Sequence, residues 1–105
     1  MMPNVFITIN DDNSNEVYLT LIDAERFSKK GYKVYILFLN NSFLSNNQFK
    51  QIISELINNG VKIYTTQRVN DDSIEEIKFD DFMKMIDNNV DIFIRQGPAC
   101  PNAVR

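Results

Sequence analysis

The 105-residue sequence contains no histidine and only one cysteine, and these shortages narrow the chemistry open to the protein. Without histidine, the chain lacks the usual general base at neutral pH and the commonest metal ligand. Catalytic sets of the Ser/His/Asp or Cys/His kind are therefore excluded. One thiol also cannot form an internal disulfide, and it cannot supply a zinc site, which needs several thiolate or imidazole ligands. We accordingly predict no metal site and no cofactor.

Long apolar runs and an excess of positive charge are also missing. The longest apolar run covers residues 34–39, far short of the roughly 20 residues that a membrane-spanning helix needs. The net charge is −3 and no basic stretch stands out, which argues against nucleic-acid binding. No charged segment followed by an apolar one marks a signal peptide, so we expect a cytoplasmic protein. Glycine-rich phosphate-binding signatures are absent as well.

The chain does contain a repeated phrase. Gly-Tyr-Lys-Val-Tyr at residues 31–35 returns as Gly-Val-Lys-Ile-Tyr at residues 60–64, each time after a helix-like stretch. Glycine suits the left-handed residue that ends a helix, and the Val/Ile-Tyr pair suits a strand. Two strands that each follow a helix require crossover connections, which predicts a parallel sheet.

The remaining sequence continues this alternation and predicts a single α/β domain over residues 1–105, with a C-terminal tail at 96–105. Strands are predicted at 5–9, 33–39, 62–66 and 91–95, with residues 77–79 as a candidate edge strand. Helices are predicted at 14–30, 47–59 and 80–88. Their N-terminal caps are expected at Asn13, at Asn46 or Asn47, and at Asp80.

Ligands of open parallel sheets bind beyond the carboxyl ends of the strands, so polar residues there are the candidate binding residues. The predicted ligand-binding set is Asn10, Asp11, Asn40, Ser42, Thr66, Gln67, Arg68 and Arg95. The alternative interpretation is that these side chains simply end strands, because turns favour such residues. Cys100 is the candidate nucleophile, and a working thiol there needs a nearby cation, which Arg68 or Arg95 can supply. The alternative is an ordinary free thiol in an incidental tail.

The order and spacing of these segments resemble the DsrE/DsrF-like family of small sulfur-relay proteins, which includes the YchN-like and TusD-like members. The resemblance covers residues 4–95. It depends most on Ala-Glu-Arg-Phe at 24–27 and the chain from there to Leu39, and on residues 59–66. It implies a three-layer α/β/α sandwich whose sheet is mainly parallel, with about five strands. It also implies a role in sulfur transfer with a sulfur-carrier protein as partner.

Active members of that family carry a persulfide on a cysteine just after the strand that matches residues 62–66. Here that stretch is Thr-Thr-Gln-Arg at 65–68, without cysteine. Two interpretations stay open: a member without catalysis, or a member in which Cys100 takes the role. A third interpretation, independent of the family, is a non-catalytic module that binds a small ligand or a protein.

The resemblance further implies a homo-oligomer, a trimer or a hexamer. A separate motive is the number of aromatic residues expected near the surface, which subunit contacts would bury. Tyr18, Phe43 and Phe49 are the residues expected to be buried in this way.

Overall fold

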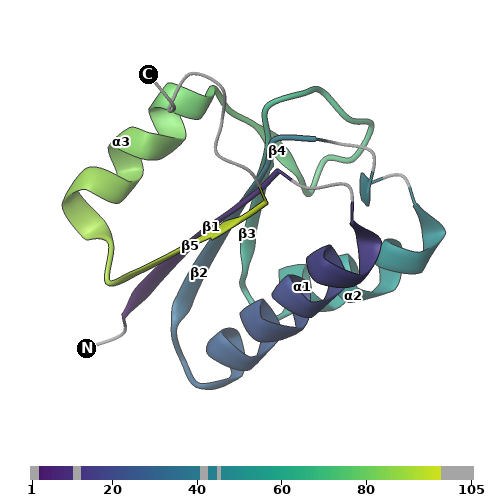
Figure 1. The fold of residues 1–105 in the computed structure, drawn as a ribbon, viewed down its shortest axis with the longest axis horizontal. Helices are drawn as coiled ribbons and strands as arrows, with labels where there is room; N and C mark the ends of the chain where they lie inside the picture. Colours follow the sequence, from purple (N-terminus) through teal and green to yellow (C-terminus); the bar gives the residue numbers. More distant parts are fainter. Residues whose placement is uncertain (1–2, 11–12, 41–42, 45, 98–105) are drawn as a thin grey trace.

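The computed structural model describes residues 3–10, 13–40, 43, 44 and 46–97. Five strands and three helices make up a three-layer sandwich, with the sheet between α3 on one side and α1 and α2 on the other (Figure 1). In chain order these are β1 (Asn4–Ile9), α1 (Ser14–Lys29), β2 (Lys33–Phe38), α2 (Asn47–Asn58), β3 (Lys62–Thr65), β4 (Glu75–Glu76), α3 (Phe79–Asn89) and β5 (Ile92–Gln96). The predicted fold class is therefore confirmed.

All four strand pairings in the sheet are parallel, and the strand order is β4-β3-β2-β1-β5. The repeated phrase accounts for two of the crossovers, α1 to β2 and α2 to β3. Gly31 and Gly60 have φ angles of +92° and +91°, the left-handed conformation that glycine adopts without a steric penalty. The interpretation of each copy as the end of a helix followed by a strand is confirmed.

Side-chain caps begin the first two helices. Asn13 accepts hydrogen bonds from the backbone N–H groups of Asn15 and Glu16 at 3.1 and 3.2 Å, and Asn46 accepts one from Gln48 at 2.8 Å. These caps satisfy donors that have no partner within the helix. The predicted caps at Asn13 and Asn46 are thus confirmed.

Two predictions around α3 are wrong. The helix begins at Phe79 after Lys78, so Asp80 is not its cap but lies in the first turn, where a carboxylate favours the helix dipole. The edge strand is residues 75 and 76 rather than 77–79. Its register is set by β3, because Glu75 and Glu76 pair with Tyr64 and Thr65, and Ile77 already points into the packing beneath α3.

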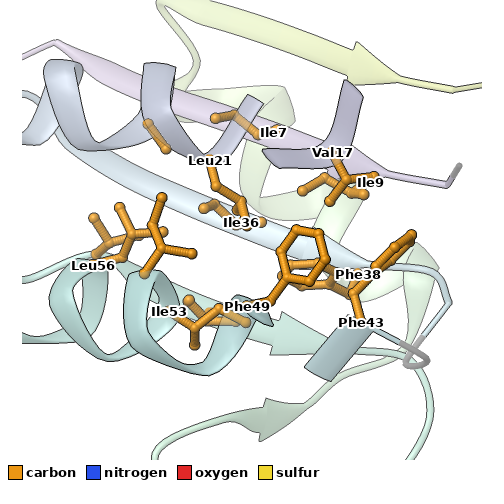
Figure 2. Close-up of a cluster of buried hydrophobic side chains, with 14 of the residues drawn as sticks. Ile7, Ile9, Val17, Leu21, Ile36, Phe38, Phe43, Phe49, Ile53 and Leu56 are labelled. Carbon is orange, nitrogen blue, oxygen red and sulfur yellow. The ribbon is translucent and has the colours of Figure 1, made fainter. Parts of the chain in front are cut away.

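The larger part of the core lies between the sheet and the α1/α2 layer (Figure 2). Alternate residues of the strands, such as Ile7 and Ile36, meet Leu21 of α1 and Leu56 of α2. The helical spacing of apolar residues in α1 and α2 thus becomes a buried stripe, as the periodicity predicts. The buried members of this cluster include Val5, Ile9, Val17, Ala24, Phe38, Phe43, Phe49 and Ile53.

The burial of Phe43 and Phe49 corrects an expectation. Their rings pack edge to face with centroids 5.0 Å apart, and both side chains are buried within the chain itself. They are therefore not surface aromatics awaiting a partner subunit. Tyr18, which also contacts Phe49, is the one of the three that remains exposed.

The opposite face of the sheet carries a smaller, more aromatic cluster under α3. Phe82 lies edge to face against Phe6 and Tyr64, with ring centroids 5.7 and 5.8 Å away. Tyr35 stacks on Phe6 at 4.6 Å. Ile86 and Leu37 complete the buried part of this cluster. One helix covers this face, which leaves part of β5 open to solvent.

Candidate functional site

The carboxyl ends of the strands are level with one another. Hydrogen bonds between backbone groups continue the sheet ladder just beyond the strands and tie each end to its neighbour. These bonds run from Asn10 N to Gln96 O (2.8 Å), Leu39 N to Ile9 O (2.9 Å), Thr66 N to Phe38 O (3.2 Å) and Ile77 N to Thr65 O (2.9 Å). The polar residues that follow the strands are thereby brought to one edge of the molecule.

Three of the predicted binding residues meet along this edge. Asn10 follows β1, Asn40 comes two residues after β2, and Thr66 directly follows β3. The Thr66 hydroxyl donates to the backbone oxygen of Leu39 at 3.5 Å, beside Asn40. All three side chains are half-buried, so they form a polar rim on three adjacent strands.

The strand order singles out one position on this rim. From β1 the chain proceeds through α1 to β2 on one side, whereas β5, reached through α3, lies on the other side of β1. The crossovers diverge between β1 and β5, and ligands of open α/β sheets bind at such switch points. The residues there are Asn10 and Gln96, which the backbone bond between them holds together.

A tight turn after β3 positions Gln67. The buried Thr65 hydroxyl donates to the backbone oxygen of Gln67 at 2.9 Å and accepts from the backbone N–H of the same residue at 3.1 Å. Both polar groups of the turn are satisfied in this way, and the Gln67 side chain remains exposed. Thr65 therefore has a structural role near the end of the strand after which the resembled family carries cysteine.

Arg68 lies apart from the rim, in a cavity of about 440 Å³ next to the first turns of α2. The chain between β3 and β4 forms one wall, and Lys50 of α2 lies on the other. The lining combines two cations and one carboxylate with three apolar side chains: Leu44, Lys50, Arg68, Val69, Asn70, Asp71 and Ile74. Such a mixture suits a small amphipathic ligand with a negative group.

The carboxylate in this cavity is held in a local turn. Asp71 accepts hydrogen bonds from the hydroxyl and from the backbone N–H of Ser73, the latter at 2.9 Å. These bonds, with a smaller contribution from the Lys50 charge, lower the pKa of Asp71. Asp71 thus stays ionised and partly offsets the two cations, which leaves one net positive charge in the cavity.

The other predicted residues lie elsewhere. Arg95 is inside β5, where it pairs with Thr8, and its side chain is exposed on the α3 face. Asp11, Ser42 and Cys100 lie outside the described residues. The edge therefore unites Asn10, Asn40 and Thr66, with Gln67 in the turn beside Thr66, while Arg68 and Arg95 lie in two other places.

Two cavity residues were missed from the sequence. Lys50 lies in the first turn of a predicted helix, directly after the loop at the end of a strand. Its position near the carboxyl edge is therefore predictable from the sequence. Asp71 belongs to the linker after β3, and no spacing rule relates it to Lys50. Neither residue is adjacent to the end of a strand, which is the feature that identifies candidate residues in the sequence.

Among residues 3–10, 13–40, 43, 44 and 46–97, no group of three or more acidic or cysteine side chains is placed to hold a metal ion. In the same part of the chain, no helix has the length and apolar character needed to cross a membrane. The chain matches no protein-family model, and no curated protein is significantly similar to it.

Proposed function

We propose that this chain is a DsrE/DsrF-like protein of sulfur transfer in which Cys100 carries the sulfur. The observation that supports this most is the position of the end of β5 at the carboxyl edge, joined to the end of β1. Cys100 follows Gly97 by three residues, and an extended chain spans at most about 3.6 Å per residue. Chain length alone therefore limits the separation between the Cα atoms of Gly97 and Cys100 to about 11 Å.

The chemistry needs no cofactor and no net oxidation. The Cys100 thiolate attacks the outer sulfur of a donor persulfide, R–S–SH. A new S–S bond forms on Cys100 while the donor's S–S bond breaks, and the donor departs as the thiolate R–S⁻. A thiol of a sulfur-carrier partner then takes the outer sulfur by the same exchange, which regenerates Cys100.

The residues at the end of β3 bear on whether Cys100 is the residue that carries the sulfur. The resembled family places its cysteine just after this strand, where the present chain has Thr66 and Gln67, in a turn that the hydroxyl of Thr65 closes. These residues supply hydroxyl and amide groups but no sulfur. If the chain retains sulfur transfer, the chemistry therefore falls to Cys100. We also expect the trimer or hexamer that the resemblance implies.

The experiment is mass measurement of the intact chain after incubation with a small persulfide donor. Wild-type protein should gain about 32 Da, the mass of one sulfur atom, and lose it on addition of dithiothreitol. The Cys100→Ser variant is the matched control and should gain nothing. A wild-type chain that stays at its original mass would end the sulfur-transfer proposal.

A second candidate function is the binding of a small anion without chemistry. The cavity next to α2 favours it, because Lys50 and Arg68 face a space of about 440 Å³. That volume falls in the range of small-molecule sites, roughly 300–1,000 Å³. The guanidinium of Arg68 can hold a carboxylate or phosphate through two parallel hydrogen bonds. Leu44, Val69 and Ile74 would contact an apolar part of the ligand.

Calorimetric titration tests this candidate with two probes, inorganic phosphate and octanoate. Arg68→Gln and Lys50→Gln should each weaken binding about tenfold, since each removes one charge-assisted hydrogen bond. Lys62→Gln removes an exposed lysine of β3 outside this cavity and should leave the affinity unchanged. Equal affinities for all four proteins would reject the cavity as the binding site.

A further inference from the structure

The two edges of the sheet differ in how they are protected. At one edge, β4 is only two residues long and both are exposed glutamates. Short, charged edge strands discourage pairing with other chains. At the other edge, β5 has five residues with the sequence Ile-Phe-Ile-Arg-Gln. Within the part of the chain that the structure describes, its outer side has no partner strand.

Apolar side chains are exposed around β5. Among the described residues, four large apolar side chains are exposed, and two of them are here, Val90 at 38% and Phe93 at 42%. Ile92 and Ile94 are half-buried on the opposite face. An apolar, unpaired edge of this length is a template for another strand.

The backbone groups of β5 are divided between its two sides. The backbone oxygen of Gln96 accepts from the N–H of Asn10, which follows β1, and in the parallel ladder Ile9 is the partner of Gln96. Because successive residues of a strand direct their N–H and C=O groups to opposite sides, those of Phe93 and Arg95 are directed away from β1. The outer side therefore offers donors and acceptors at two alternate positions.

We infer that β5 pairs antiparallel with β5 of a second copy of this chain, about a two-fold axis at Phe93, so that the two sheets become continuous. In this register Phe93 faces Phe93 of the second copy and Ile92 faces Ile94. Asp91 of each copy faces Arg95 of the other, so the interface contains two pairs of opposite charge. The edge is thus complementary to itself, as an isologous interface requires.

Charge selects this register over its neighbours. Residues that lie directly opposite each other in an antiparallel pair point to the same face of the sheet. The two-fold axis must therefore lie between the two copies of one and the same residue. An axis at Ile92 would oppose Asp91 to Phe93, and an axis at Ile94 would oppose Arg95 to Phe93. Only the axis at Phe93 matches the two charges, and opposed charges across strands are stabilising where like charges are destabilising. One oxygen of Asp91 accepts from Asn4 N at 2.7 Å, which leaves the other for Arg95.

The test is the solution mass, measured by light scattering over a range of protein concentrations. The wild-type mass should be an even multiple of the 12.2 kDa chain mass, as a dimer or as a hexamer built from two trimers. Arg95→Asp places two carboxylates opposite each other at both ends of the interface. It should weaken the pairing at least tenfold and halve the mass at about micromolar concentration.

The decisive test is a double variant in which the two charged residues are exchanged. Asp91→Arg combined with Arg95→Asp restores opposite charges across the two-fold axis, so the double variant should regain the wild-type mass. Leu19→Lys changes an even more exposed apolar residue, on α1, and should leave the mass unaltered. A wild-type monomer at all concentrations, or an assembly that Arg95→Asp leaves intact, would overturn the inference. Circular dichroism of each variant verifies that the fold is retained.

Discussion

The two helical layers of this protein differ in how their helices are begun and ended. In the α1/α2 layer, each helix starts at an asparagine whose side chain accepts backbone hydrogen bonds. Each is followed, two residues after its last residue, by a glycine with φ near +91°. On the other face, α3 follows Lys78 without a side-chain cap and ends at Val90 in an extended conformation. One layer is therefore specified locally at both ends, and the other is not.

This contrast implies that α3 depends on packing more than α1 and α2 do. Its attachment to the sheet rests on Phe82 and Ile86, the buried residues that it contributes to the aromatic cluster. Isolated helices of about 11 residues are marginal in water, and an amphipathic face stabilises them only when it is docked. The α3 layer should thus open to solvent more readily than the α1/α2 layer.

Removal of one buried aromatic ring from each layer should show the difference between the two helical layers most strongly. Phe49→Ala and Phe82→Ala each delete a fully buried side chain and should each cost about 3–5 kcal/mol of unfolding free energy. Phe82→Ala should in addition release α3, because no second helix supports it. In Phe82→Ala, hydrogen exchange should then rise most in α3, while in Phe49→Ala it should rise evenly throughout the core. Uniform exchange in both variants would contradict the proposed difference.

The glycines that follow α1 and α2 give the next largest effect. Alanine at Gly31 or Gly60 must adopt φ near +90°, at a cost of about 1–2 kcal/mol. Beyond the adjoining residues of the chain, no atom lies within 4 Å of the added Cβ at either position, so the cost comes from the local backbone and not from tertiary contacts. Urea unfolding of Gly31→Ala and Gly60→Ala should give equal losses. On the α3 side, Val90→Gly should bring no gain, because Val90 is extended.

A missing cap can be added to α3. Lys78 has φ −73° and ψ 145°, the backbone conformation of an N-terminal cap. Lys78→Ser supplies an acceptor and removes a cation from the positive end of the helix dipole, so it should stabilise the protein by about 0.5–1 kcal/mol. Lys78→Ala removes the charge alone and separates the two contributions. Asn13→Ala, in the other layer, should destabilise by about 1 kcal/mol.

The success of sequence reasoning follows the same division. Asn13, Asn46, Gly31 and Gly60 are local signals, and they predicted α1, α2 and the parallel strands that follow these helices. Where such signals were lacking, as at Asp80 and in the edge strand, the predictions were wrong.

The candidate site shows a similar limit. The level strand ends placed Asn10, Asn40 and Thr66 together as the parallel topology predicts. The cavity that contains Arg68 depends on the path of the chain after β3, and no local rule in the sequence fixes that path. The self-complementary edge likewise requires the strand order, because only that order makes β5 an outer strand.

The smallest expected effect is alkaline pH dependence from the α3 face. Burial, with the nearby charges of Glu75 and Tyr35, raises the pKa of Tyr64 above its usual value near 10. The folded state then holds the phenol proton more tightly than the unfolded state. The contribution of the protonated Tyr64 phenol to the unfolding free energy is complete below about pH 10 and is lost as the pH rises through the folded-state pKa. Tyr64→Phe should flatten the decline of unfolding free energy above pH 10, measured by urea titration. Tyr18→Phe, an exposed site on α1, is the matched control, and an equal flattening there would reject the assignment to Tyr64.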